Sequence, residues 1–115
     1  MELHNWDRIP AEQMNPQITR KVVHSAHMTI ARLVIQKDAV VPAHSHSNEQ
    51  IANVETGALH FHIGGVDQIV RAGESLVIPP NVPHGVVALE ETTVTDIFTP
   101  RREDWISGDD AYLRR

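Results

Sequence analysis

Residues 44–57 read HSHSNEQIANVETG, and residues 73–84 read GESLVIPPNVPH. The first stretch opens with a His-x-His pair, His44 and His46, and the second ends with His84. Residues two apart in an extended strand share a face, so the paired imidazoles can converge on one ion at a nitrogen distance of about 2.1 Å. These histidines therefore predict a metal site.

Short β-like segments, separated by Gly, Pro and Asn, continue from these stretches in both directions. Runs rich in β-branched and aromatic residues predict strands, and they cover residues 17–24, 28–36, 49–55, 58–63, 66–71, 74–78, 84–89 and 92–98. A short helix is predicted near the C-terminus, within residues 101–106. About eight strands, roughly ten residues apart and without crossover helices, indicate a sandwich, a jelly roll or a barrel and disfavour a parallel α/β fold.

Alternation along the strands predicts which side chains face the core, because successive side chains point to opposite faces of a sheet. In segment 49–55 the inward set is Gln50, Ala52 and Val54. Gly57 can supply the positive φ of a hairpin turn between this segment and the next. Gln50 is therefore predicted to be a polar side chain that faces the interior.

The length and charge of the chain limit its possible functions. Its 115 residues suit one domain, which we expect to span residues 1–115. The net charge of −5, without a cluster of Lys and Arg, argues against a nucleic-acid partner or an anionic membrane surface. No apolar run approaches the roughly 18 residues of a membrane helix. The N-terminus lacks the pattern of a secretory signal, so we expect a cytoplasmic protein.

Histidine and cysteine usage narrows the chemistry. The chain has 8 histidines and no cysteine. Such a high histidine content favours metal or proton chemistry. The lack of cysteine excludes disulfides, thiolate ligands and cysteine nucleophiles, so a metal ion would need imidazole, carboxylate or amide ligands.

The two stretches resemble the paired signature motifs of the cupin superfamily. The first motif is His-x-His, three residues, an acid, six residues and Gly. The second is Gly, five residues, Pro-x-Gly, two residues, His, three residues and Asn, and the chain keeps both spacings. The resemblance implies an all-β fold, a cupin-type jelly-roll β-barrel over roughly residues 17–99. It also implies one divalent metal ion, such as nickel, zinc, iron or manganese, held by His44, His46, Gln50 and His84.

Three residues depart from these motifs. Gln50 replaces the usual Glu, Asn81 replaces a Gly, and Ala88 replaces an Asn. Asn tolerates the left-handed backbone conformation better than most residues, so the change at position 81 is mild. An amide oxygen can still bind a metal but carries no negative charge. The ion then keeps more of its Lewis acidity toward a substrate oxygen.

Within the superfamily, the chain is most similar to small proteins that linearise unsaturated uronates in pectin and alginate degradation. The similarity rests on the Glu-Gln of the first stretch, on residues 79–85 (PPNVPHG) and on residues 96–105 (DIFTPRREDW). It implies conversion of 4,5-unsaturated uronate monosaccharides to linear ketonised uronates by ring opening and tautomerisation. The catalytic residues would be Asp96, Phe98 and Arg102, the substrate a sugar acid, and the protein a homodimer.

Two other functions fit the same motifs: a metal-dependent dioxygenase and a non-catalytic cupin that binds a sugar or an effector. Oxygenase sites more often pair histidine with a carboxylate, so the neutral Gln50 argues against the first. No DNA-binding segment accompanies the predicted barrel, which argues against a transcription-factor form of the second.

Four charged residues are open to more than one interpretation. Asp96 alternates with apolar residues on a face that should be buried, so it is either catalytic or ion-paired with an arginine. Arg102 either contacts substrate or is a solvated charge beside two acidic residues. Arg20 and Arg32 could contact substrate, but we predict that each is a lone exposed arginine.

A second His-x-His pair, His60 and His62, serves as an internal control. Its neighbours Leu59, Phe61 and Ile63 form the apolar alternate set, so the two histidines are predicted to face outward. The remaining histidines are predicted to be ordinary polar residues: His4, His24 and His27.

Overall fold

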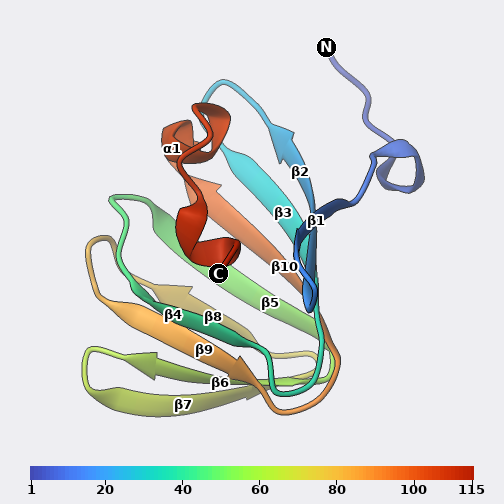
Figure 1. The fold of residues 1–115 in the computed structure, drawn as a ribbon. Helices are drawn as coiled ribbons and strands as arrows, with labels where there is room; N and C mark the ends of the chain where they lie inside the picture. The colour runs from blue at the N-terminus through green and yellow to red at the C-terminus, as the bar shows by residue number, and fades with distance from the viewer.

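Two antiparallel sheets face each other in the computed structural model, which describes residues 1–115 (Figure 1). The strands of the larger sheet, in spatial order, are β1 (Glu12–Asn15), β2 (Ile18–His24), β3 (Thr29–Ile35), β10 (Thr92–Thr99), β5 (Glu49–Thr56) and β8 (Ser75–Ile78). Those of the smaller sheet are β4 (Val40–His44), β9 (His84–Ala88), β6 (Ala58–Ile63) and β7 (Val66–Arg71). This arrangement confirms the predicted all-β jelly roll.

The predicted strands are all present, and their ends differ from the prediction by at most one residue. The short helix α1 (Glu103–Ile106) lies inside the predicted segment. Four elements were not predicted: β1, β4 and the 3-10 turns η1 (Trp6–Arg8) and η2 (Ala111–Leu113). None of the helices is long and apolar enough to cross a membrane.

The two unpredicted strands lack the usual local signals and depend on their neighbours. β1 reads EQMN, without a β-branched residue, and pairs with β2. β4 contains Pro42, and its register with β9 shifts between Val41 and His44. Strand propensity reflects packing on a neighbouring strand as much as residue type, so such segments are hard to assign from sequence.

The core lies between the sheets and follows the predicted alternation. Gln50, Ala52 and Val54 are buried, as expected for the inward face of β5. Gly57 closes the β5–β6 turn with a φ of 88°, and a Cβ there would collide with the backbone of Glu91 and with Thr92. The turn therefore requires glycine both for its conformation and for its space.

The prediction that Arg20 is exposed was wrong. Its side chain is 4% exposed, and Nη2 lies 3.0 Å from a carboxylate oxygen of Asp110. Its guanidinium also lies 4.6 Å from the ring centroid of Trp105. The C-terminal segment runs from α1, near the end of β10, to η2 beside β4 (Figure 1). Its residues Trp105 and Asp110 make the contacts that cover Arg20. Arg32 is exposed as predicted and stacks over Trp6.

Candidate functional site

Three histidines meet between the sheets near one end of the smaller sheet. His44 ends β4 and His84 begins β9, and the two residues are direct partners in the strand register. His46 follows in the loop from β4 to β5. Each histidine offers one ring nitrogen, and these nitrogens all lie within 4.8 Å of one another. The structure therefore brings together the three histidines that the sequence singled out.

The orientation of each ring is set by a backbone carbonyl two residues away. The ring Nδ1 atoms of His44, His46 and His84 lie 2.9, 3.0 and 2.8 Å from the carbonyl oxygens of Pro42, Asn48 and Val82. A carbonyl only accepts hydrogen bonds, so Nδ1 carries the proton and Nε2 keeps a lone pair. This is the arrangement by which proteins present histidine to a metal ion.

Burial keeps the three imidazoles neutral. It lowers the pKa of His44 and of His46 to about 4, and it also lowers the pKa of His84. The nearby Arg102 guanidinium lowers the pKa of His46 and His84 further. Neutral imidazole is the form that binds metal, so protons compete weakly for these nitrogens at neutral pH.

Two features of the cluster fit a cation. The His84 Nε2 atom is buried without a hydrogen-bond partner, which is costly for a polar atom unless something else satisfies it. The His46 Nε2 atom lies 3.1 Å from Oε1 of Gln50, so two acceptors face each other. Ligands at right angles around an ion, each about 2.1 Å from it, are about 3 Å apart. The donor set is thus positioned to bind a divalent metal ion.

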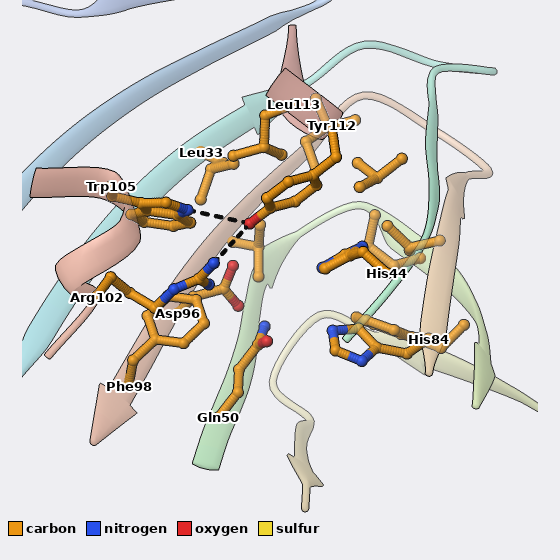
Figure 2. A pocket seen from close by; sticks show the side chains of 16 residues that line it. Leu33, His44, Gln50, His84, Asp96, Phe98, Arg102, Trp105, Tyr112 and Leu113 are labelled. Atoms are coloured by element: carbon orange, nitrogen blue, oxygen red, sulfur yellow. Dashed lines mark hydrogen bonds between the residues drawn. The ribbon is translucent and has the colours of Figure 1, made fainter. Parts of the chain in front are cut away.

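A cavity of about 50 Å³ adjoins the histidine cluster (Figure 2). Both sheets and the C-terminal segment contribute to its walls. They consist of Leu33, Ile35, Val41, His44, Gln50, Leu59, Phe61, His84, Val86, Val94, Asp96, Phe98, Arg102, Trp105, Tyr112 and Leu113. Every site residue predicted from the sequence therefore lines this cavity except His46, which lines a separate groove together with Asn48 and Arg101.

Asp96 enters the cavity from β10, opposite Ala52 of β5. Its Oδ1 atom is buried and has no hydrogen-bond partner. Burial raises the pKa of this carboxyl to about 7, while the Gln50 amide and the Arg102 charge act in the opposite direction. Arg102 forms its salt bridge with Asp104 instead. The interpretation of Asp96 as half of a structural ion pair was therefore wrong.

Arg102 is 1% exposed, so its interpretation as a solvated charge was also wrong. Its Nε and Nη2 atoms donate to the two carboxylate oxygens of Asp104 at 3.0 and 2.8 Å. Nη2 also donates to the hydroxyl of Tyr112 at 3.0 Å. The guanidinium lies over the rings of Phe98 and Trp105, with Cζ 4.7 and 4.2 Å from their centroids. Only Nη1 is left without a protein partner.

Phe98 is buried and forms part of the cavity wall, with its ring edge-on to that of His46 at 5.6 Å. Trp105 and Tyr112, for which no role was predicted, line the same cavity. Composition is the one feature of the sequence that could have indicated them, because the chain has only two Trp, two Phe and one Tyr. An aromatic side chain in a polar C-terminal segment is unusual in such a chain.

The control histidines lie away from the cluster. His60 and His62 point outward from β6, and both contact one carboxylate oxygen of Asp67, at 3.3 and 2.8 Å. The outward prediction for this pair is confirmed. His24 is hydrogen-bonded to Thr29 outside the cluster.

Comparison with known proteins agrees with this geometry. The sequence profile of the family described as "Cupin domain" matches residues 31–98. The chain belongs to the cupin family. This cupin is 33% identical over 103 residues to the pectin degradation protein KdgF of Dickeya dadantii, covering 87% of this chain and 94% of that protein. The predicted resemblance to that branch of the cupins is thereby confirmed.

Two solved cupin structures are also similar to this one. KdgF from Halomonas sp. superposes with a TM-score of 0.85 at 29% identity, covering 91% of this cupin and 98% of that chain. An RmlC-like cupin from Shewanella frigidimarina gives a TM-score of 0.85 at 25% identity, covering 91% and 96% of the two chains. The agreement extends over nearly the whole length of each protein.

Proposed function

We propose that this cupin converts 4,5-unsaturated uronate monosaccharides to linear ketonised uronates, with one divalent metal ion held by His44, His46, Gln50 and His84. One observation carries the proposal: Asp96, with a pKa near neutrality, shares a small cavity with the imidazoles of His44 and His84. The similarity to a pectin degradation protein supports a sugar acid as substrate.

The proposed reaction is an isomerisation. The bond between the ring oxygen and the anomeric carbon breaks while the anomeric hydroxyl loses its proton and the ring oxygen gains one, which leaves an aldehyde at one carbon and an enol at another. The enol then becomes a ketone when one proton leaves oxygen and one is added to carbon. Atoms and electrons balance without an oxidant or reductant, so the protein must supply only proton transfer and stabilisation of negative charge.

Asp96 is suited to the proton transfers. A general acid or base works best when its pKa is close to the working pH, because both protonation states are then accessible. The pKa of about 7 meets this condition, and the free Oδ1 atom is not engaged elsewhere. Asp96 can therefore accept the enol proton and return a proton to carbon.

The other cavity residues bind and orient. Arg102 places a positive charge beside Asp96, and its free Nη1 can donate to the substrate carboxylate. Phe98 forms an apolar wall that limits access of water. When bound, a divalent ion supplies Lewis acidity toward a substrate oxygen, and the neutral Gln50 leaves more of its charge unbalanced than a carboxylate would.

The test is to incubate metal-loaded protein with unsaturated galacturonate and to follow the loss of ultraviolet absorbance by the conjugated enol ether. We expect metal-dependent loss of absorbance without uptake of oxygen, measured in parallel with an oxygen electrode. Oxygen uptake would support the dioxygenase instead. Saturable binding without any absorbance change would support the non-catalytic sugar-binding cupin.

The proposal includes a homodimer in the cytoplasm. Small cupins often pair, which supports the homodimer. Sedimentation equilibrium at micromolar concentration should give twice the chain mass, and fractionation of the source cells should recover the protein with cytoplasmic markers.

A further inference from the structure

Tyr112 connects the two sides of the cavity. Its ring stacks on that of His44, with centroids 4.1 Å apart and planes inclined by 24°. Its hydroxyl accepts hydrogen bonds from Nη2 of Arg102 at 3.0 Å and from Nε1 of Trp105 at 3.1 Å (Figure 2). One side chain of η2 thus contacts both the histidine cluster and the arginine proposed to bind substrate.

The Arg102 guanidinium has two edges that can hold a carboxylate. Asp104 occupies the edge formed by Nε and Nη2 with both of its oxygens. The edge formed by Nη1 and Nη2 carries only the neutral Tyr112 hydroxyl, and Nη1 has no partner. A carboxylate there would accept from both nitrogens and would bring a negative charge, so it is the stronger partner.

The Tyr112 hydroxyl blocks this edge of Arg102. It lies 3.0 Å from Nη2, so a carboxylate oxygen cannot take this position while the hydroxyl stays there. Tyr112 also lines the cavity together with Asp96. The hydroxyl must therefore move before a substrate carboxylate can bind both nitrogens of this edge.

The backbone on both sides of Tyr112 is anchored. Asp110 is buried and bonded to Arg20, and the carbonyl of the buried Leu113 accepts from Nδ2 of Asn15 at 3.2 Å. The intervening Ala111 is exposed. Tyr112 can therefore leave this position by rotation of its side chain while the backbone of η2 stays in place.

We propose that Tyr112 is a gate whose hydroxyl holds on Arg102 the position that the substrate carboxylate takes. The inference rests on the proposed function, because it requires a substrate that carries a carboxylate. Binding of the acid releases the hydroxyl from Arg102, and the ring leaves His44. A sugar without a carboxylate cannot replace the hydrogen bond between Arg102 and the Tyr112 hydroxyl. The gate therefore also selects for sugar acids.

The test measures binding of galacturonate, a saturated uronate, and of galactose, which lacks the carboxylate, by calorimetry on metal-loaded protein. Tyr112→Phe keeps the ring but removes the hydroxyl. Galacturonate should bind this variant about tenfold more tightly, because the hydrogen bond from Arg102 to the Tyr112 hydroxyl has to be broken only in the wild type. Galactose affinity should not change. Ala111→Ser, next to it in the same turn, is the matched control and should bind both sugars as the wild type does.

Fluorescence supplies a second measurement that does not depend on this variant. In a Trp6→Phe background, Trp105 is the remaining tryptophan, and its emission should shift when galacturonate breaks its bond to Tyr112. No shift, together with equal galacturonate affinity in the wild type and Tyr112→Phe, would overturn the gate.

Steady-state kinetics separate the gate from a catalytic tyrosine. With unsaturated galacturonate, the Tyr112→Phe substitution should act mainly on KM, which should fall about tenfold, and should change kcat little. A loss of turnover rate by about two orders of magnitude or more at constant KM would contradict the gate and would indicate a proton donor. A wild type without turnover, but with the affinity and fluorescence changes, would contradict the proposed reaction and leave the gate supported.

Discussion

The Nε2 atom of His46 lies 3.1 Å from Oε1 of Gln50, and neither atom carries a proton to share. The imidazole proton is on Nδ1, which donates to the carbonyl of Asn48. Two lone pairs at this separation repel each other unless a cation lies between them. A cation bound as proposed would relieve this repulsion and would make Gln50 a fourth ligand beside the three histidines.

Metal content should distinguish the two His-x-His pairs. His46→Ala removes one nitrogen of the cluster, so elemental analysis after dialysis should show clear loss of the ion. His60→Ala removes a histidine that contacts only Asp67 on the surface and should retain the wild-type amount. Equal retention by both variants would contradict the assignment of the ligands.

Metal retention should persist to lower pH than ordinary histidines would allow. The unperturbed histidine pKa of about 6.5 gives release near pH 6. The pKa values of His44 and His46 are instead about 4, so protons compete for these nitrogens only at lower pH. We expect most of the metal to remain at pH 6 and to leave between about pH 5 and 4. Dialysis against buffers of stepped pH, followed by elemental analysis, measures this, and half-release at or above pH 6 would contradict it.

The same pKa values affect the metal-free protein. Its folded state binds fewer protons than the unfolded chain between about pH 4 and 6.5, so its stability should fall as pH drops through this window. Urea unfolding of metal-free protein should give a lower free energy of unfolding at pH 5 than at pH 7. A higher value at pH 5 would mean that these histidines gain protons on folding.

Asp96→Asn should inactivate the protein without unfolding it. The amide keeps the shape of the side chain but removes proton transfer, a step typically worth about 10²–10⁴-fold. Metal content should stay at the wild-type level. A metallated Asp96→Asn protein that turns over substrate normally would eliminate the catalytic role of Asp96.

The stability of Asp96→Asn should depend on pH in a specific direction. The folded pKa of Asp96 is raised to about 7 from 3.8, so the folded state binds a proton that the unfolded chain has lost. The contribution of Asp96 to the stability of the metal-free wild type is therefore lost as pH rises through this window, opposite in sign to the larger combined contribution of the histidines. The variant cannot ionise, so at pH 8 it should exceed the wild type by a few kcal/mol, at about 1.4 kcal/mol per pKa unit. At pH 4 the difference should be close to zero. Urea unfolding of both proteins without metal measures this difference in the free energy of unfolding. The same difference at pH 4 and pH 8 would contradict the raised pKa of Asp96.

Arg102 and its neighbour Arg101 form a matched pair for mutagenesis. Arg102→Ala removes buried bonds to Asp104 and Tyr112 and should lower the free energy of unfolding by about 1.5–3 kcal/mol. Arg101 pairs with Glu103 in a more exposed setting, so Arg101→Ala should change it by less than about 1 kcal/mol. Chemical denaturation measures the free energy of unfolding of both variants. Equal losses in the two would contradict the difference between a buried and a more exposed arginine.

Alanine substitutions at two glycines with similar backbone angles distinguish the cost of conformational strain from the cost of a steric clash. Gly57 and Gly65 have φ values of 88° and 83°. An added Cβ at Gly65 has no neighbour within 4 Å, whereas one at Gly57 would meet Thr92 Cα at 2.8 Å. Gly65→Ala should therefore cost about 1–2 kcal/mol from its conformation alone. Gly57→Ala should cost clearly more, as measured by thermal unfolding.

The local pattern of the chain determined most of the fold and the histidine cluster. Strand segments such as 58–63 are recognisable because alternating apolar side chains define a buried face wherever the strand packs. His44 and His46 could be assigned because their spacing and the motif around them are local. Asn81 adopts a φ of 65°, as expected from its tolerance of the left-handed turn.

Only the tertiary structure decided what surrounds that cluster. Arg20 is buried because Asp110, ninety positions later, supplies its carboxylate, and no local pattern indicates such a partner. Asp96 lacks an ion pair because Asp104 occupies Arg102. Tyr112 completes the cavity because η2 lies beside β4. Partners that are distant in sequence set the burial, and burial sets both the pKa of a carboxyl and the space left for a substrate.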